Sequence, residues 1–186
     1  MPPTRAYAAC YKPLSPHFTR VLELHAGELS DPLVGTLVAQ PIDSEPYEAV
    51  SYVWGGLPTK TMVVDGTPVP ITANLKRALK AFRPRPPSLT DGHARENSRR
   101  RRRLWADSVC INQDDMSERL SQVELMGRIF ASASRVLAWL GLDEEGLTSF
   151  AMAVIRDVLE DPEAALHEAR ILLHLDDPMD NDRLDE

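Results

Sequence analysis

The segment from Leu104 to Gly141 constrains the fold more than any other part of the chain. It opens with a short apolar run over residues 104–111, interrupted by one carboxylate at Asp107, and this run predicts a strand. A polar turn follows, and then a helix is predicted whose apolar stripe faces inward: Leu120, Val123, Met126, Gly127 and Phe130. The apolar run from Arg135 to Leu140 predicts a strand buried on both faces. Strand, helix, strand indicates an α/β fold.

The first half of the chain predicts a sheet of short strands joined by turns, over residues 18–24, 33–39 and 48–54. Asp65 and Gly66 stand between two β-branched runs, which is the strongest hairpin signal in the chain. Pro68 and Pro70 place the second strand of that hairpin at a sheet edge, because proline has no N–H to donate. Asn74 is expected to cap the next helix, whose apolar face is Leu75, Ala78, Leu79 and Phe82. We therefore expect one domain with a mixed β-sheet flanked by helices.

Length and composition fit a single soluble globular domain with a short appendage. The chain has 186 residues, of which 43% are hydrophobic and 26% charged, and no apolar run is long enough to cross a bilayer. Prolines and a lysine interrupt the first residues, where a secretory signal needs an unbroken apolar segment, so we expect a cytoplasmic protein. Cys10 and Cys110 have no His or Cys neighbour at metal-ligand spacing, which predicts two free thiols and no metal site.

Charge is distributed unevenly along the chain. The formal net charge is −7, yet the stretch that ends in Arg99–Arg103 is rich in arginine and proline. Its composition predicts a disordered insertion over residues 84–103. Nucleic-acid binding or nuclear import through these arginines is an alternative, which is disfavoured because no aromatic residues interleave with them as a stacking platform. The expected organisation is an extension over 1–16, a domain over 17–142, a helical segment over 143–175 and an acidic disordered tail over 176–186.

The polar residues of the central segment each have a structural and a functional interpretation. A carboxylate in an apolar segment, such as Asp107, must either pair with a hydrogen-bond donor, as when it pins a backbone turn, or lie at the edge of a cleft. The sequence does not decide between these two interpretations. Asn112 and Gln113 suit ligand recognition, but turn structure is favoured for both. Glu118 follows Asp115 at capping-box spacing, which explains it without chemistry, although catalysis stays open.

The block around Trp54 offers a second set of candidate residues. Alternation along a strand places Ser51 on one face and Tyr52 with Trp54 on the other. Trp54 and Trp105 are each candidates for a wall against which a planar ring stacks, although a core role is favoured for tryptophan. Gly55 is expected to permit a sharp turn.

Four blocks of this sequence together resemble one known family. LWADSVCINQDD, at residues 104–115, and YEAVSYVWG, at 47–55, closely resemble the two hallmark motifs of the fungal heterokaryon-incompatibility (HET) domain. Residues 11–24 and 71–82 are similar to its opening strand and to its next helix, so the resemblance covers Tyr11 to Leu142. It implies a role in fungal non-self recognition and programmed cell death signalling. HET proteins usually continue far past this point, so we expect a short member or a truncated gene model.

The resemblance leaves two mechanisms open. An interaction or effector module, with protein partners or self-association, no cofactor and no membrane contact, is preferred. The alternative follows from a remote likeness of the family to TIR domains, some of which cleave nicotinamide from NAD, and it makes NAD the candidate substrate. Its catalytic carboxylates would be Glu118 first, then Asp107 and Glu48. The expected ligand-binding residues are Ser51, Trp54, Gly55, Trp105, Asn112 and Gln113, which requires the two blocks to converge on one pocket.

Overall fold

Seven strands form one mixed β-sheet in the computed structural model, which describes residues 9–86 and 101–142 and, beyond them, residues 153, 156 and 160. The strands are β1 (Phe18–His25), β2 (Val34–Pro41), β3 (Glu48–Tyr52), β4 (Lys60–Val64), β5 (Thr67–Ile71), β6 (Arg101–Trp105) and β7 (Arg135–Trp139). The helices are α1 (Ala73–Phe82), α3 (Asp107–Cys110) and α4 (Met116–Ser132). The chain up to Gly141 is one unit and residues 142–186 are another.

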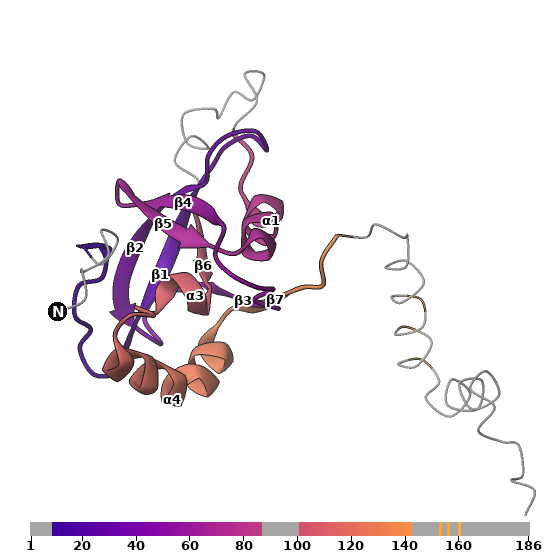
Figure 1. The fold of residues 1–186 in the computed structure, drawn as a ribbon. Coiled ribbons are helices and arrows are strands. Elements are labelled where there is room, and N and C mark those ends of the chain that lie inside the picture. Colours follow the sequence, from indigo (N-terminus) through magenta and orange to yellow (C-terminus); the bar gives the residue numbers. More distant parts are fainter. Residues whose placement is uncertain (1–8, 87–100, 143–152, 154–155, 157–159, 161–186) are drawn as a thin grey trace, which may run out of the picture. The chain divides into compact units, whose positions relative to one another are not determined.

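The strand order is β5-β4-β2-β1-β6-β3-β7. Strand β1 pairs antiparallel with β2 and β6, and β4 pairs antiparallel with β5. The pairs β2–β4, β3–β6 and β3–β7 are parallel. In Figure 1, α4 lies below the sheet, whereas α1 lies towards its upper part beside β3 and β4. The mixed sheet with flanking helices confirms the expected α/β class.

The hairpin prediction is confirmed. Asp65 and Gly66 both have positive φ, 49° and 77°, as the favoured two-residue hairpin turn requires. The turn joins β4 to β5, with Met62 opposite Val69, and β5 with its two prolines is the edge strand.

The cap of α1 differs from the expectation. Thr72 is the N-cap, and its Oγ1 accepts a hydrogen bond from the amide of Leu75 at 3.2 Å. Asn74 is already inside the helix, and its side chain instead donates to the carbonyl of Val53 at 2.6 Å. The expected buried face is otherwise correct, since Leu75, Ala78 and Leu79 are buried.

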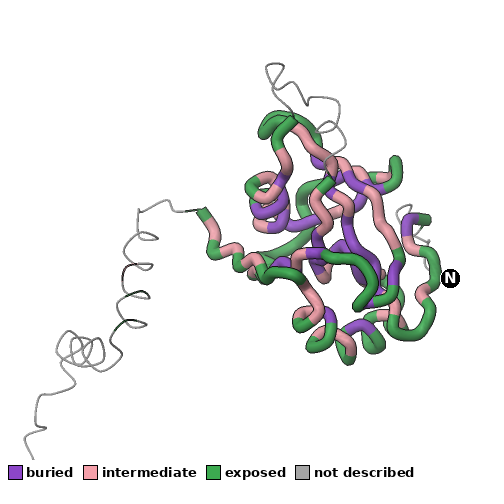
Figure 2. The backbone as a smooth tube through the Cα atoms, turned by 180° about the vertical axis from the view of Figure 1, so that it is seen from behind, coloured by how far each residue is buried: buried purple, intermediate pink, exposed green. Residues whose placement is uncertain are grey.

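The stripe that the apolar spacing predicted for α4 is only partly correct. Met126 and Phe130 are partly buried and pack against the core, whereas Leu120 and Val123 are 61% and 58% exposed. The fully buried residues of this helix are Gln122 and Ile129. The physical reason is a polar contact, because the Gln122 carbonyl accepts a hydrogen bond from the Thr19 hydroxyl at 2.9 Å. Figure 2 shows buried and exposed stretches alternating along α4.

The region after residue 100 corrects three further expectations. Arg101–Arg103 belong to β6, so they are not part of a disordered insertion; the preceding residues 87–100 lie outside the described chain. The strand expected over 104–111 ends at Trp105, and Asp107 begins the short helix α3. Strand β7 is an edge strand with Val136 49% exposed, so it is not buried on both faces.

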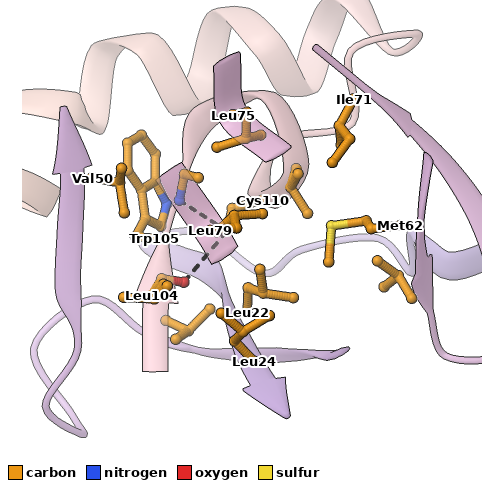
Figure 3. Packing of buried hydrophobic residues seen from close by; sticks show 14 of the residues in the cluster. Leu22, Leu24, Val50, Met62, Ile71, Leu75, Leu79, Leu104, Trp105 and Cys110 are labelled. Atoms are coloured by element: carbon orange, nitrogen blue, oxygen red, sulfur yellow. Dashed lines mark hydrogen bonds between the residues drawn. The ribbon is translucent and has the colours of Figure 1, made fainter. Parts of the chain in front are cut away.

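The core lies between the sheet and the helices. Figure 3 shows Trp105, Cys110 and Leu22 close together among its members. Cys10, from the segment expected to be an extension, packs into the same cluster, and both cysteines are free thiols as expected. The helical segment and the acidic tail expected beyond residue 142 lie outside the described residues, apart from three helical positions at 153, 156 and 160. Within the described chain, no helix has the length and apolarity that a membrane span needs.

Candidate functional site

Asp107 connects the two motif blocks of the chain. Its Oδ2 accepts a hydrogen bond from the indole Nε1 of Trp54 at 2.8 Å, and its Oδ1 accepts one from the Tyr52 hydroxyl at 3.0 Å. The backbone amide of Ser108 also donates to Oδ1, at 2.7 Å. Because β6 and β3 are parallel neighbours, the residue just past β6 meets the residues at and beyond the end of β3. The carboxylate is therefore satisfied by fixed donors.

A chain of hydroxyl groups leads to the same carboxylate. The Tyr52 and Ser108 hydroxyl oxygens are 2.5 Å apart, and since Tyr52 donates to Asp107, Ser108 donates to Tyr52. Burial raises the pKa of the Tyr52 phenol far above its ordinary range, and the nearby Asp107 carboxylate raises it further. The phenol is thus a neutral donor at physiological pH. It is no base for Ser108, so the arrangement does not activate that serine as a nucleophile.

The loop after β3 is held in place from two sides. Gly55 and Gly56 have φ values of 65° and 89°, which glycine adopts without strain, so the expected turn is present. Asn74 binds the Val53 carbonyl and also accepts a hydrogen bond from the indole of Trp139 at 2.9 Å. Together with the Trp54–Asp107 bond, these contacts fix the loop against α1, α3 and β7.

A pocket of about 140 Å³ lies beside this loop. Its lining comes from the N-terminal segment, the loop after β3, strand β5 with the cap of α1, and α3 with the turn after it: Tyr11, Trp54, Gly56, Pro58, Val69, Pro70, Ile71, Thr72, Ser108, Gln113 and Asp114. Gln113 is positioned by a hydrogen bond from its Nε2 to the Asp107 carbonyl at 2.9 Å. The pocket combines an apolar wall with hydroxyl, amide and carboxylate groups, as small-molecule sites commonly do.

Glu118 forms a buried ion pair elsewhere. Its carboxylate binds Arg20 of β1 through both oxygens, at 2.5 and 2.9 Å, and also accepts the amide of Asn112 at 2.7 Å. The side chains of Arg20 and Glu118 are only 3% and 11% exposed. The capping box is half formed, because Asp115 accepts the amide of Glu118 while Glu118 turns towards Arg20. The carboxylate ties α4 to β1.

Glu48 forms a third fixed carboxylate. It binds the Arg102 guanidinium through both oxygens, at 2.5 and 2.9 Å. The same guanidinium lies over the Phe82 ring, 5.5 Å from the ring centroid. Glu48 begins β3 and Tyr52 ends it, so roughly 13 Å of strand separate Glu48 from the Asp107 group.

Comparison with known proteins identifies the family. The model of the family described as heterokaryon incompatibility protein (HET) matches residues 47–179. The chain belongs to the HET family. The heterokaryon incompatibility protein 6, OR allele, of Neurospora crassa is 36% identical over an aligned length of 137 residues, and the match covers 66% of this chain and 18% of the Neurospora protein. This HET chain thus spans less than a fifth of the length of that curated relative. No solved structure matches it.

The structure of this HET domain brings together only part of the expected site. Trp54 and Gln113 line the pocket, and Asp107 stands behind them as the acceptor for both Trp54 and Tyr52. The remaining expected residues do not line it: Glu48, Ser51, Gly55, Trp105, Asn112 and Glu118. Trp105 is fully buried, and its Nε1 donates to the Thr19 hydroxyl at 2.9 Å, which is the core role favoured for it. Ser51 is exposed, and Asn112 Oδ1 accepts the amide of Asp114, as a turn residue does.

Sequence reasoning missed three residues of this HET domain that hold the motif blocks in place. Arg20 is a single arginine within an otherwise largely apolar strand, and this pattern could have predicted a buried ion pair. Ser108 and Thr19 gave no signal, because single hydroxyl residues occur throughout the chain. Among the described residues, no three His, Cys, Asp or Glu side chains gather as a metal site would require.

Acid should weaken the Glu48 contact of this HET domain. The hydrogen bond from Arg102 holds the pKa of the Glu48 carboxyl below its ordinary value of 4.5, while burial opposes it. Since the folded pKa is the lower one, this contribution to stability is present above pH 4.5 and is lost as the pH falls through the folded pKa. In urea unfolding, Glu48→Gln should be less stable than the wild type at pH 6, and the difference should shrink at pH 3. Exposed Glu124→Gln is the matched control, and an unchanged difference for Glu48→Gln contradicts the prediction.

Proposed function

We propose that this HET domain acts in fungal non-self recognition, as a protein-interaction module in programmed cell death signalling. Membership of the family and the name of the Neurospora relative support the first part. One observation carries the second part: all three candidate catalytic carboxylates are engaged by fixed partners, Glu118 by Arg20, Glu48 by Arg102, and Asp107 by Trp54 and Tyr52. Residues engaged in this way build a rigid domain, which explains the motifs without a substrate.

The test is expression of the chain in a filamentous fungus from an inducible promoter. Death of hyphal compartments, counted by uptake of a vital dye, together with an unchanged cellular NAD content supports the interaction module. Death preceded by loss of NAD supports the second candidate below instead. Survival of cells that contain the folded chain contradicts both. Trp105→Ala, which should unfold a large part of the protein, controls for death caused by expression alone.

NAD cleavage is a second candidate, and the pocket beside Trp54 is the observation that favours it. An indole wall with Ser108 and Gln113 near it suits a small planar amide such as nicotinamide, and Asp107 is the candidate catalytic carboxylate that accepts a hydrogen bond from this indole. A carboxylate there would stabilise the positive charge that develops on the ribose as the glycosidic bond breaks. Glu118 fits this role less well, because Arg20 neutralises it.

The test of this candidate is release of nicotinamide from NAD by the purified chain, followed by chromatography. The wild type should release nicotinamide and Asp107→Asn should not, while Glu28→Gln, at an exposed position between β1 and β2, should match the wild type. Absence of nicotinamide at high protein concentration, or equal release by Asp107→Asn, removes NAD cleavage at this pocket.

A further inference from the structure

The outward side of α4 carries a row of exposed apolar side chains. Met116, Leu120 and Val123 are 60%, 61% and 58% exposed, and they follow one another at intervals of four and three residues. Gly127 continues the row, with open space around the position where a side chain would begin. Exposed apolar side chains are common singly, but a row at this spacing on one helix is the pattern of a helix that packs against another.

This row does not belong to the core of the domain. The side of α4 that packs on the sheet carries Gln122 and Ile129, which are 2% and 0% exposed, and the partly buried Leu125, Met126 and Phe130 pack against the core beside them. At 3.6 residues per turn, the centre of the exposed row lies roughly 120° around the helix from the centre of that packed side. The row therefore points away from the sheet and is available to another helix.

The charged residues beside the row are complementary between two copies of the helix. If Met116 and Val123 occupy d positions of a heptad, Leu120 and Gly127 occupy a positions, Arg119 occupies g and Glu124 occupies e. In a parallel pair of helices, each g residue faces the e residue five positions later on the other helix. Arg119 of each copy would face Glu124 of the other, twice by symmetry. Both side chains are exposed, and within the described chain neither takes part in a salt bridge.

The same charges disfavour the antiparallel arrangement. In an antiparallel pair, g residues flank g residues and e residues flank e residues, so Arg119 and Glu124 would stand on opposite sides of the interface. No attractive pair between them would then form. Charge at these positions thus selects both the partner and the orientation.

We propose that α4 is a self-association surface, on which a second copy of this chain packs parallel about a two-fold axis. The inference rests on the proposed function, because it names the partner of the interaction module. The helix has 17 residues, about 25 Å in length, and presents two heptads. An interface of this size falls below the standard range of roughly 1,200–2,000 Å² for stable complexes, so the dimer is weak and forms as the local concentration rises.

The experiment is sedimentation equilibrium of the full chain at a series of concentrations, with two charge-reversal variants. The wild type should show a monomer–dimer equilibrium. Arg119→Glu places two acidic residues opposite each other, and Glu124→Arg places two basic residues there, so each variant alone should dimerise about tenfold more weakly or less still. An equimolar mixture of the two variants restores both attractive pairs, and it should form a heterodimer at least as readily as the wild type does. The double variant Arg119→Glu/Glu124→Arg should likewise regain self-association.

Two further variants test whether the effect is specific to α4. Arg77→Glu, a charge reversal on the exposed side of α1, should leave the equilibrium of the wild type unchanged. Leu120→Asp should abolish dimers, with circular dichroism showing an intact fold. A wild type that stays monomeric at all concentrations, single variants that associate as the wild type does, or a mixture no more associated than its components would each overturn the inference. Because these measurements use purified protein, a monomer that still kills hyphae rejects the dimer and leaves the proposed function standing.

Discussion

Glu118→Ala is expected to lower the free energy of unfolding by about 3–5 kcal/mol, which is the usual cost of removing one partner of a buried ion pair. The carboxylate of Glu118 is the only anion that the structure places against the Arg20 guanidinium among the described residues, and the Arg20 side chain is 3% exposed. Without it, Arg20 keeps only the neutral carbonyls of Lys12 and Cys110 as acceptors. The Asn112 amide also loses its acceptor. Urea unfolding followed by circular dichroism measures the loss.

Two further variants separate the loss of the ion pair from the loss of a helix residue. Glu124→Ala, an exposed glutamate on the same helix, should change stability by about 0.5 kcal/mol or less. Arg20→Met/Glu118→Leu should be more stable than Glu118→Ala, because it leaves no uncompensated charge in the interior. Equal losses for Glu118→Ala and Glu124→Ala would show that the pair does not hold α4 against β1.

Local signals predicted the parts of the fold that local physics decides. The hairpin at Asp65 and Gly66 was predictable because its turn needs two residues that tolerate positive φ. The edge position of β5 followed from its prolines, and the strand from Phe18 followed from its apolar and β-branched residues. In each case the deciding interaction lies within a few residues of the signal.

Signals failed where a distant residue decides the outcome. The spacing of apolar residues placed Leu120 and Val123 inward, but Thr19, which is 103 residues from Gln122, selects the other side of α4. Arg101–Arg103 were expected in a loop because arginine runs rarely order themselves. In the structure each of the three finds an acidic partner, Glu23, Glu48 or Glu45, on neighbouring segments. These three ion pairs offset the repulsion between the arginines, and residues 101–103 form part of strand β6.

The candidate site was predictable to a similar extent. The two motif blocks do meet, because β3 and β6 are parallel neighbours and their C-terminal ends lie at one edge. The sequence could not show that Glu118 would face Arg20, 98 residues away, or that Glu48 would stand at the far end of β3. Asp107 was left open between pinning a turn and bordering a cleft, and in the structure it holds Trp54 beside the pocket.

Trp105→Ala is expected to cost about 3–5 kcal/mol, the typical cost of removing a large aromatic side chain from a core. Trp105 is fully buried and packs edge-to-face on Phe130 of α4, with ring centroids 5.5 Å apart. Its indole N–H also anchors the Thr19 hydroxyl, which in turn donates to Gln122. The substitution thus leaves a cavity and removes one bond from the chain that orients α4. Urea unfolding should show the loss, and Trp105→Phe should recover most of the packing but not the Thr19 contact.

Trp54→Ala is the matched comparison, because the sequence alone assigned both tryptophans the same candidate role. Trp54 is 45% exposed and makes one hydrogen bond to the Asp107 carboxylate, so its removal should cost about 1 kcal/mol or less. If the pocket binds a ligand, Trp54→Ala should weaken that binding while the fold persists, whereas Trp105→Ala should reduce binding only through loss of the folded state. Equal destabilisation by the two substitutions would contradict the division between a core tryptophan and a pocket tryptophan.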